Sequence, residues 1–84
     1  MKVHTKTLQK VLLKTSDANI AFDDLCELLV HLGFDTRVKG SHHIFRKNGV
    51  YEKINLQRDG SKAKSYQVRQ VRSIILNYGL GGEN

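Results

Sequence analysis

Three segments of the chain carry apolar residues at the three- and four-residue spacing of an amphipathic helix. The first runs from Thr5 to about Thr15, and its apolar positions are Leu8, Val11 and Leu12. The second starts near Ala21, and its apolar positions are Phe22, Leu25, Cys26, Leu29 and Leu32. The third follows Ser65, and its apolar positions are Val68, Val71, Ile74, Ile75 and Tyr78. The pattern therefore predicts three helices.

The second and third helices share the same termination signal. Gly33 follows one and Gly79 follows the other, and glycine readily adopts the left-handed conformation after a helix C-cap. The apolar pairs expected to touch in the resulting Schellman motifs are Leu29 with Phe34 and Ile75 with Leu80. At the other ends, Asn19 or a close neighbour is the expected N-cap of the second helix, and Ser65 that of the third.

Between these two helices the pattern is that of a β-sheet. The expected strands are Asp35–Lys39, Ser41–Lys47 and Val50–Gln57. Gly40 is expected to form a bend or bulge after the first strand. Asn48-Gly49 joins the other two, and this dipeptide is a strong hairpin signal because both positions of the tight turn require a positive φ. The polar segment Arg58–Lys64 is expected to be a basic loop.

The order helix, helix, strand, strand, strand, helix predicts an α+β fold with helices on one face of a three-stranded antiparallel sheet. A helix, three antiparallel strands and a helix is the arrangement of double-stranded-RNA-binding domains, here with an extra N-terminal helix. Residues 1–84 are enough for one domain only. We expect its core over about 22–80, the extra helix over about 5–15 and a flexible tail over 81–84.

The hairpin turn determines which side chains share a face of the sheet. If Asn48-Gly49 is a two-residue turn, His43 pairs with Ile54 and His42 pairs with Asn55. The face that covers the helices then carries His43, Phe45, Val50, Ile54 and Leu56. The hydrated face carries His42, Arg46, Tyr51, Lys53 and Asn55. A shift of one residue would exchange the two faces.

The two adjacent histidines are therefore expected to have different roles. His43 is interpreted as a histidine at the edge of the core. His42 lies on a cationic surface, where an imidazole can exchange protons near neutral pH with RNA, whose 2′-hydroxyl is a built-in nucleophile. The alternative for His42 is an exposed histidine that only contacts phosphate.

Basic and small residues around His42 form the expected phosphate-binding set. In the catalytic interpretation, Lys39, Arg46 and Lys53 hold the phosphate, and Gly40-Ser41 lets the backbone approach it. A second basic group consists of Arg58, Lys62, Lys64, Arg69 and Arg72. This second group is either an ordinary solvated surface or an edge that grips phosphate.

Composition narrows the class of protein further. Lys and Arg number 14 against 8 Asp and Glu, and the net charge of +6 suits either a polyanionic partner or simple solubility. Cys26 is the single cysteine, which excludes an internal disulfide, and it is interpreted as a buried small hydrophobic residue. His4 and His31 have no Cys or carboxylate at metal-ligand spacing, so neither a metal nor another cofactor is expected. No apolar run suits a signal peptide or a membrane span, and a cytoplasmic location is expected.

The segment Gly40-Ser41-His42-His43-Ile44-Phe45, between a helix that ends in Leu32-Gly33-Phe34 and an Asn-Gly hairpin, resembles the HicA family of bacterial toxins. The resemblance covers about Phe22 to Leu80. It implies a fold like that of double-stranded-RNA-binding domains, ribosome-independent cleavage of mRNA, and inhibition by a HicB antitoxin that covers the active site. The family's essential histidine corresponds to His42, with His43 in reserve. The chain departs from many members in its extra N-terminal helix and in Asn55–Gly60, where many carry a Pro-His-type segment.

Three functions are therefore considered. The first is a metal-independent endoribonuclease toxin of a type II toxin–antitoxin pair, with mRNA as substrate and an acidic HicB-like antitoxin as partner. The second is a non-catalytic RNA-binding module of the same fold. The third is a cationic subunit whose partner is an acidic protein. The three differ in whether RNA is cut, only bound, or not bound.

Overall fold

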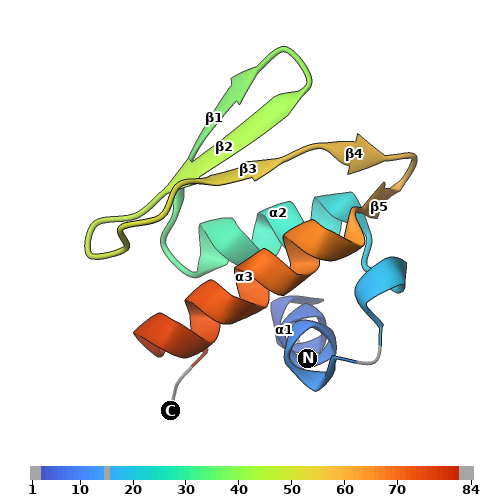
Figure 1. Ribbon diagram of the computed structural model, residues 1–84, viewed down its shortest axis with the longest axis horizontal. Helices are drawn as coiled ribbons and strands as arrows, with labels where there is room; N and C mark the ends of the chain where they lie inside the picture. The colour runs from blue at the N-terminus through green and yellow to red at the C-terminus, as the bar shows by residue number, and fades with distance from the viewer. Residues whose placement is uncertain (1–2, 15, 82–84) are drawn as a thin grey trace.

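The computed structural model describes residues 3–14 and 16–81, and its elements follow the expected order (Figure 1). The helices are α1 (Val3–Leu13), the 3₁₀ helix η1 (Asp17–Asn19), α2 (Phe22–His31) and α3 (Ser65–Tyr78). The strands are β1 (Asp35–Lys39), β2 (His42–Arg46), β3 (Ile54–Leu56), β4 (Arg58–Asp59) and β5 (Lys62–Ala63). The expected helix end at Thr15 and residues 82–84 of the expected tail lie outside the described residues.

A three-stranded antiparallel sheet of order β1-β2-β3 forms one layer, and the helices lie on one side of it (Figure 1). The α+β class and the main element order were thus predicted correctly. The prediction of a loop over 58–64 was wrong, because β4 and β5 pair as a second, two-stranded sheet. Gly60, with a φ of +64°, occupies the reversal between them, and a glycine in this conformation suits a tight hairpin turn.

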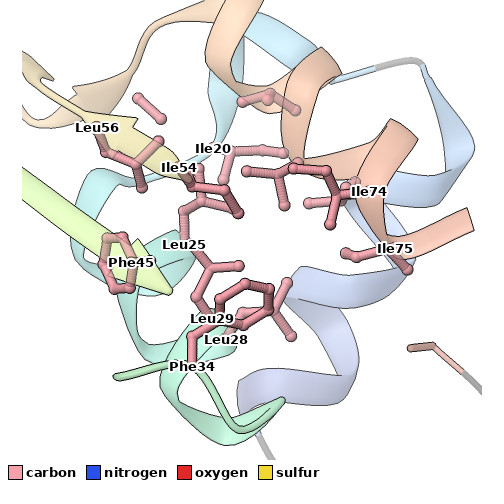
Figure 2. Packing of buried hydrophobic residues seen from close by; sticks show 14 of the residues in the cluster. Ile20, Leu25, Leu28, Leu29, Phe34, Phe45, Ile54, Leu56, Ile74 and Ile75 are labelled. Atoms are coloured by element: carbon pink, nitrogen blue, oxygen red, sulfur yellow. The ribbon is translucent and has the colours of Figure 1, made fainter. Parts of the chain in front are cut away.

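The hydrophobic core fills the space between the helices and the sheet face that points toward them, here called the inner face (Figure 2). From the sheet, Phe45, Ile54 and Leu56 are completely buried. The buried apolar residues of α2 and α3 are Phe22, Leu25, Leu28, Leu29, Val68, Val71, Ile74 and Ile75. Each such side chain contributes roughly 1.5–3 kcal/mol by leaving water. The helical spacing in the sequence therefore identified most of the core.

The extra helix α1 packs on α2 and α3, with Val11 buried. Arg72 of α3 holds it in place, donating hydrogen bonds to the carbonyl oxygen of Val11 (3.1 Å) and to both carboxylate oxygens of Asp17 (2.9 and 3.3 Å). Val11 lies in the last turn of α1, where carbonyl oxygens lack partners within the helix. Arg72 is buried, so both interpretations given to it, a solvated surface and a phosphate-gripping edge, were wrong.

Both helix C-termini contain the expected Schellman hydrogen bond. It runs from the backbone N of Phe34 to O of Leu29 and from the backbone N of Leu80 to O of Ile75, each 3.0 Å. The N-cap predictions were wrong, since Ala21 and Lys64 occupy these positions and neither forms a side-chain cap. At α2 the β4–β5 hairpin replaces the cap, because the backbone N of Phe22 donates to O of Ser61 at 3.0 Å.

The chain reverses at Asn48-Gly49, but not in the expected tight turn. The backbone N of Val50 donates to O of Lys47 at 3.0 Å, and Gly49 has a φ of +91°. Within the described part of the chain, Lys14 is the one non-glycine residue with a positive φ, so Asn48 is not left-handed. In this turn φ is positive at the second central position only. Such a turn does not match the twist of a hairpin, so its flanking strands diverge.

The pairing of β2 with β3 is consequently displaced. His43 lies opposite Leu56 rather than Ile54, a shift of two residues, and the predicted register was wrong. Successive side chains of a strand point to opposite faces, so an even shift leaves each residue on its expected face. The assignment of faces was therefore correct although the register was not.

Candidate functional site

The sheet face that points away from the helices, here called the outer face, carries His42. Alternation along the paired strands also places Asp35, Arg37, Lys39, Ile44, Arg46 and Asn55 on it. The pairing puts Lys39 directly opposite His42, and Asp35 opposite Arg46. Lys53, just before β3, lines the same surface. The structure thus places His42 and the predicted cations Lys39, Arg46 and Lys53 on one face, with Lys39 next to His42 and Arg46 four residues along β2.

His42 is exposed, and its ring Nδ1 lies 3.1 Å from Oδ1 of Asn55. Asn55 was expected directly opposite His42, whereas it lies opposite Ile44 and reaches the imidazole diagonally. An amide oxygen can only accept a hydrogen bond, so this contact requires the proton on Nδ1. In the neutral ring this tautomer leaves a lone pair on Nε2, so Asn55 orients the neutral imidazole with Nε2 as its proton acceptor.

His43 lies on the inner face and is half-buried. Its ring meets the ring of Phe22 edge to face, with centroids 4.9 Å apart and planes at 78°. Such a contact is ordinary core packing for an aromatic side chain. The interpretation of His43 as a histidine at the edge of the core is confirmed, and its packing gives no support for the reserve catalytic role.

A hollow of about 480 Å³ opens on the outer face and reaches Lys39, the residue opposite His42, although His42 itself does not line it. Its lining residues are Asp35, Thr36, Arg37, Lys39, Ile44, Arg46 and Lys53. The four cations among them are exposed and outnumber the one carboxylate, so the hollow attracts anions. Arg37 was missing from the predicted phosphate-binding set. Its position two residues before Lys39 on the same strand is the signal that would have identified it.

Gly40-Ser41 forms the turn between β1 and β2, immediately before His42. Gly40 has a φ of +61°, a conformation that favours glycine. Among the described residues, nothing lies within 4 Å of where its Cβ would be. The hydroxyl oxygen of Ser41 accepts a hydrogen bond from the side-chain amide of Gln57 at 3.4 Å. The space beside Gly40 is therefore open, and binding of a phosphate group by Gly40-Ser41 stays a prediction.

The other predicted phosphate-binding residues lie elsewhere. Arg58 forms an ion pair with Asp23 at 2.6 Å and covers the ring of Phe22 at 4.6 Å from its centroid. Lys62 donates to Oδ1 of Asn19 at 3.4 Å, and Lys64 precedes α3, half-buried. These three residues belong to the β4–β5 segment and do not line the hollow. Arg58 and Lys62 hold the hairpin against α2 and η1.

Cys26 is half-buried rather than fully buried, at the side of α2 that faces β1. Burial raises the pKa of its thiol to about 11, and the neighbouring Asp23 carboxylate adds to the rise, while Arg58 opposes it. A thiol with so high a pKa is a poor nucleophile at neutral pH. Cys26 is therefore not a candidate for nucleophilic chemistry.

Two properties of the described residues bear on the class of site. No three of their His, Cys, Asp or Glu side chains gather closely enough to bind a metal ion. None of their helices combines the length and the apolar character that crossing a membrane requires.

Comparison with protein-family models, curated proteins and solved structures finds no match. The resemblance to the HicA family and to double-stranded-RNA-binding domains therefore stays a prediction.

Proposed function

We propose that this protein is a metal-independent endoribonuclease that uses the 2′-hydroxyl of RNA as nucleophile and His42 as the proton-transfer group. One observation carries the proposal: an exposed imidazole, oriented by Asn55, lies directly opposite Lys39 at the edge of a cationic hollow. The hollow can hold the phosphate backbone, and the imidazole can act on the adjacent hydroxyl. The predicted likeness to HicA toxins agrees with this chemistry, and we propose a cytoplasmic location as well.

The proposed reaction needs one proton acceptor and one proton donor. Nε2 of His42 takes the proton of the 2′-hydroxyl, whose oxygen attacks the adjacent phosphorus. The bond from phosphorus to the 5′-oxygen breaks, and that oxygen receives a proton from the imidazolium or from water. The products are a 2′,3′-cyclic phosphate and a 5′-hydroxyl end. Because the RNA supplies the nucleophile, a 2′-deoxy substitution at the cleaved position should block the reaction.

The cations supply binding and charge stabilisation. Lys39, nearest to His42 in the pairing, would contact the reacting phosphate, while Arg37, Arg46 and Lys53 would hold its neighbours. Each contact with a single-stranded backbone should add about 0.7 to the slope of log affinity against log salt concentration. A Lys53→Gln variant should therefore bind RNA more weakly, with a shallower salt dependence.

Cleavage of a transcript in EDTA by the wild type, His42→Ala and His43→Ala tests the proposal. His42→Ala should lower the rate by about 100-fold or more, the usual contribution of a general acid or base. His43→Ala should cleave normally while unfolding at a lower temperature, because it loses only the contact with Phe22. Equal cleavage by His42→Ala and the wild type would refute the proposed role of His42.

A non-catalytic RNA-binding module is the second candidate. The hydrogen-bond partner of His42 favours this function. Asn55 supplies a neutral amide and not a carboxylate, which would stabilise the imidazolium. In the described part of the chain, no second imidazole accompanies His42 on the outer face of β1, β2 and β3. An RNA that binds with strong salt dependence but stays intact after long incubation would favour this second function.

The predicted HicA likeness further suggests an acidic HicB-like antitoxin as protein partner. A small acidic protein encoded immediately beside this one would support a toxin–antitoxin pair. An isolated gene without such a neighbour would count against it.

A further inference from the structure

β1 is an edge strand whose outer side is open. It pairs with β2 through five consecutive residue pairs, so no bulge interrupts it. In the described part of the chain, no strand pairs with its other side. The chain contains no proline, and all five residues of β1 are exposed. An open edge of this kind presents unpaired backbone N–H and C=O groups that can hydrogen-bond to another strand.

On the inner side of this edge, a groove of about 330 Å³ runs between α2 and the β1–β2 hairpin. Its lining residues are Cys26, Glu27, Val30, His31, Thr36 and Phe45. Val30 on α2 and Val38 on β1 are exposed by 54% and 58%, although both are apolar. Figure 1 shows that the β1–β2 hairpin extends away from the helices, with β1 at the edge of the sheet.

On the outer side of the same edge, β1 presents Arg37 and Lys39, with Asp35 at its start. Arg46 lies behind them on β2, opposite Asp35. A strand added to β1 would therefore place one set of alternate side chains over the apolar groove and the other set beside cations. The chemistry that fits both sides is a strand in which apolar and acidic residues alternate.

We propose that the open edge of β1 binds an extended segment of a partner protein in which apolar and acidic residues alternate. The backbone groups of β1 supply the hydrogen bonds, the groove takes the apolar side chains, and Arg37 and Lys39 pair with the acidic ones. A second copy of this chain fits less well. Each copy carries a net charge of +6 and would bring its own cationic outer face alongside the first.

Such a strand would also regulate the site. Its acidic side chains would lie next to Lys39, which is directly opposite His42. The bound strand would therefore compete with the RNA backbone for the same cations. This consequence rests on the proposed function, whereas the docking itself does not.

The docking is tested without RNA, by NMR titration of the full chain with a capped peptide as long as β1 in which valine and glutamate alternate. The expected result is a saturable shift of the β1 amide signals, with slower hydrogen exchange along the strand. A peptide in which valine and lysine alternate is the control and should bind at least about tenfold more weakly, the equivalent of one lost charge-assisted contact. Equal binding of the two peptides, or binding of neither, would overturn the proposal.

Two charge-matched variants locate the binding surface. Val30→Asp places a carboxylate in the groove, and Leu76→Asp places one on α3 at a residue that is 60% exposed and outside the groove. Val30→Asp should weaken binding of the acidic peptide by about tenfold or more, and Leu76→Asp should leave it nearly unchanged. Equal weakening by both would show a general charge effect and refute the site.

Sedimentation of the free protein separates the second copy from the proposed partner. The wild type should remain a monomer as its concentration rises. A dimer that Val30→Asp abolishes would identify the occupant of the edge as another copy and overturn the assignment to an acidic partner. RNA cleavage does not enter any of these measurements, so a failure of the docking and a failure of the ribonuclease proposal remain distinguishable.

Discussion

Replacement of Arg72 is expected to detach α1 and to destabilise the whole domain. The side chains of Arg72 and Asp17 are only 10% and 18% exposed, and their charged groups are 2.9 Å apart. Arg72→Ala leaves the Asp17 carboxylate without its partner in a poorly hydrated position, and it removes the donor to the carbonyl oxygen of Val11. Removal of one partner from a buried ion pair typically costs about 3 kcal/mol or more. For a domain of this size, that loss lowers the melting temperature by roughly 12–24 °C.

Thermal and urea unfolding of Arg72→Ala measure this loss, with Arg69→Ala as the matched control. Arg69 lies one turn earlier on α3 and is exposed, so its replacement should change stability by no more than about 0.5 kcal/mol. Asp17→Asn should destabilise nearly as strongly as Arg72→Ala, because it leaves the guanidinium buried without a counter-charge. Equal melting temperatures for Arg72→Ala and Arg69→Ala would show that the ion pair does not hold α1 in place.

Further predictions concern the site, a helix end and the thiol. Asn55→Ala should slow RNA cleavage by about tenfold, the value of one hydrogen bond, and unchanged kinetics would show that the amide does not orient His42. Gly33→Ala should destabilise the fold by about 1–3 kcal/mol in urea unfolding, because its φ of +101° is strained for alanine, whereas the Lys47 side chain that the new Cβ would meet can move aside; a neutral change would contradict this. The alkylation rate of Cys26 should rise with pH up to about 11, well above the 9.0 of an unperturbed thiol, and a plateau near 9 would contradict the effect of burial.

Local sequence signals predicted the helices and most of the core. The helical spacing of apolar residues located α1, α2 and α3, because burial of one face and a repeat of about 3.6 residues are properties of the segment itself. Gly33 and Gly79 identified two helix ends, since the left-handed conformation after a C-cap strongly favours glycine. His42 and His43 were placed on opposite faces by the alternation of a strand, and this result survived a wrong register because the shift was even.

The parts that the sequence did not predict depend on contacts between distant segments. The turn at Asn48-Gly49 did not continue into a tight hairpin. Its loop is instead held by the hydroxyl of Tyr78, which accepts from the backbone N of Tyr51 at 3.2 Å and donates to Glu52 at 2.7 Å. No local pattern reveals a contact with the end of a helix that lies so far along the chain.

The cationic residues also separate what the sequence determines from what the tertiary structure decides. Their number is a property of the composition, but their roles were decided by tertiary structure, which buried Arg72 against Asp17, paired Arg58 with Asp23, and left Lys39 beside His42. A charged side chain serves the fold or a ligand according to whether a counter-charge lies within reach, and that depends on the packing of elements distant in sequence. The sequence by itself therefore determined the helices, their ends and the two faces of the sheet, whereas only the tertiary structure decided which charges remained available for a partner.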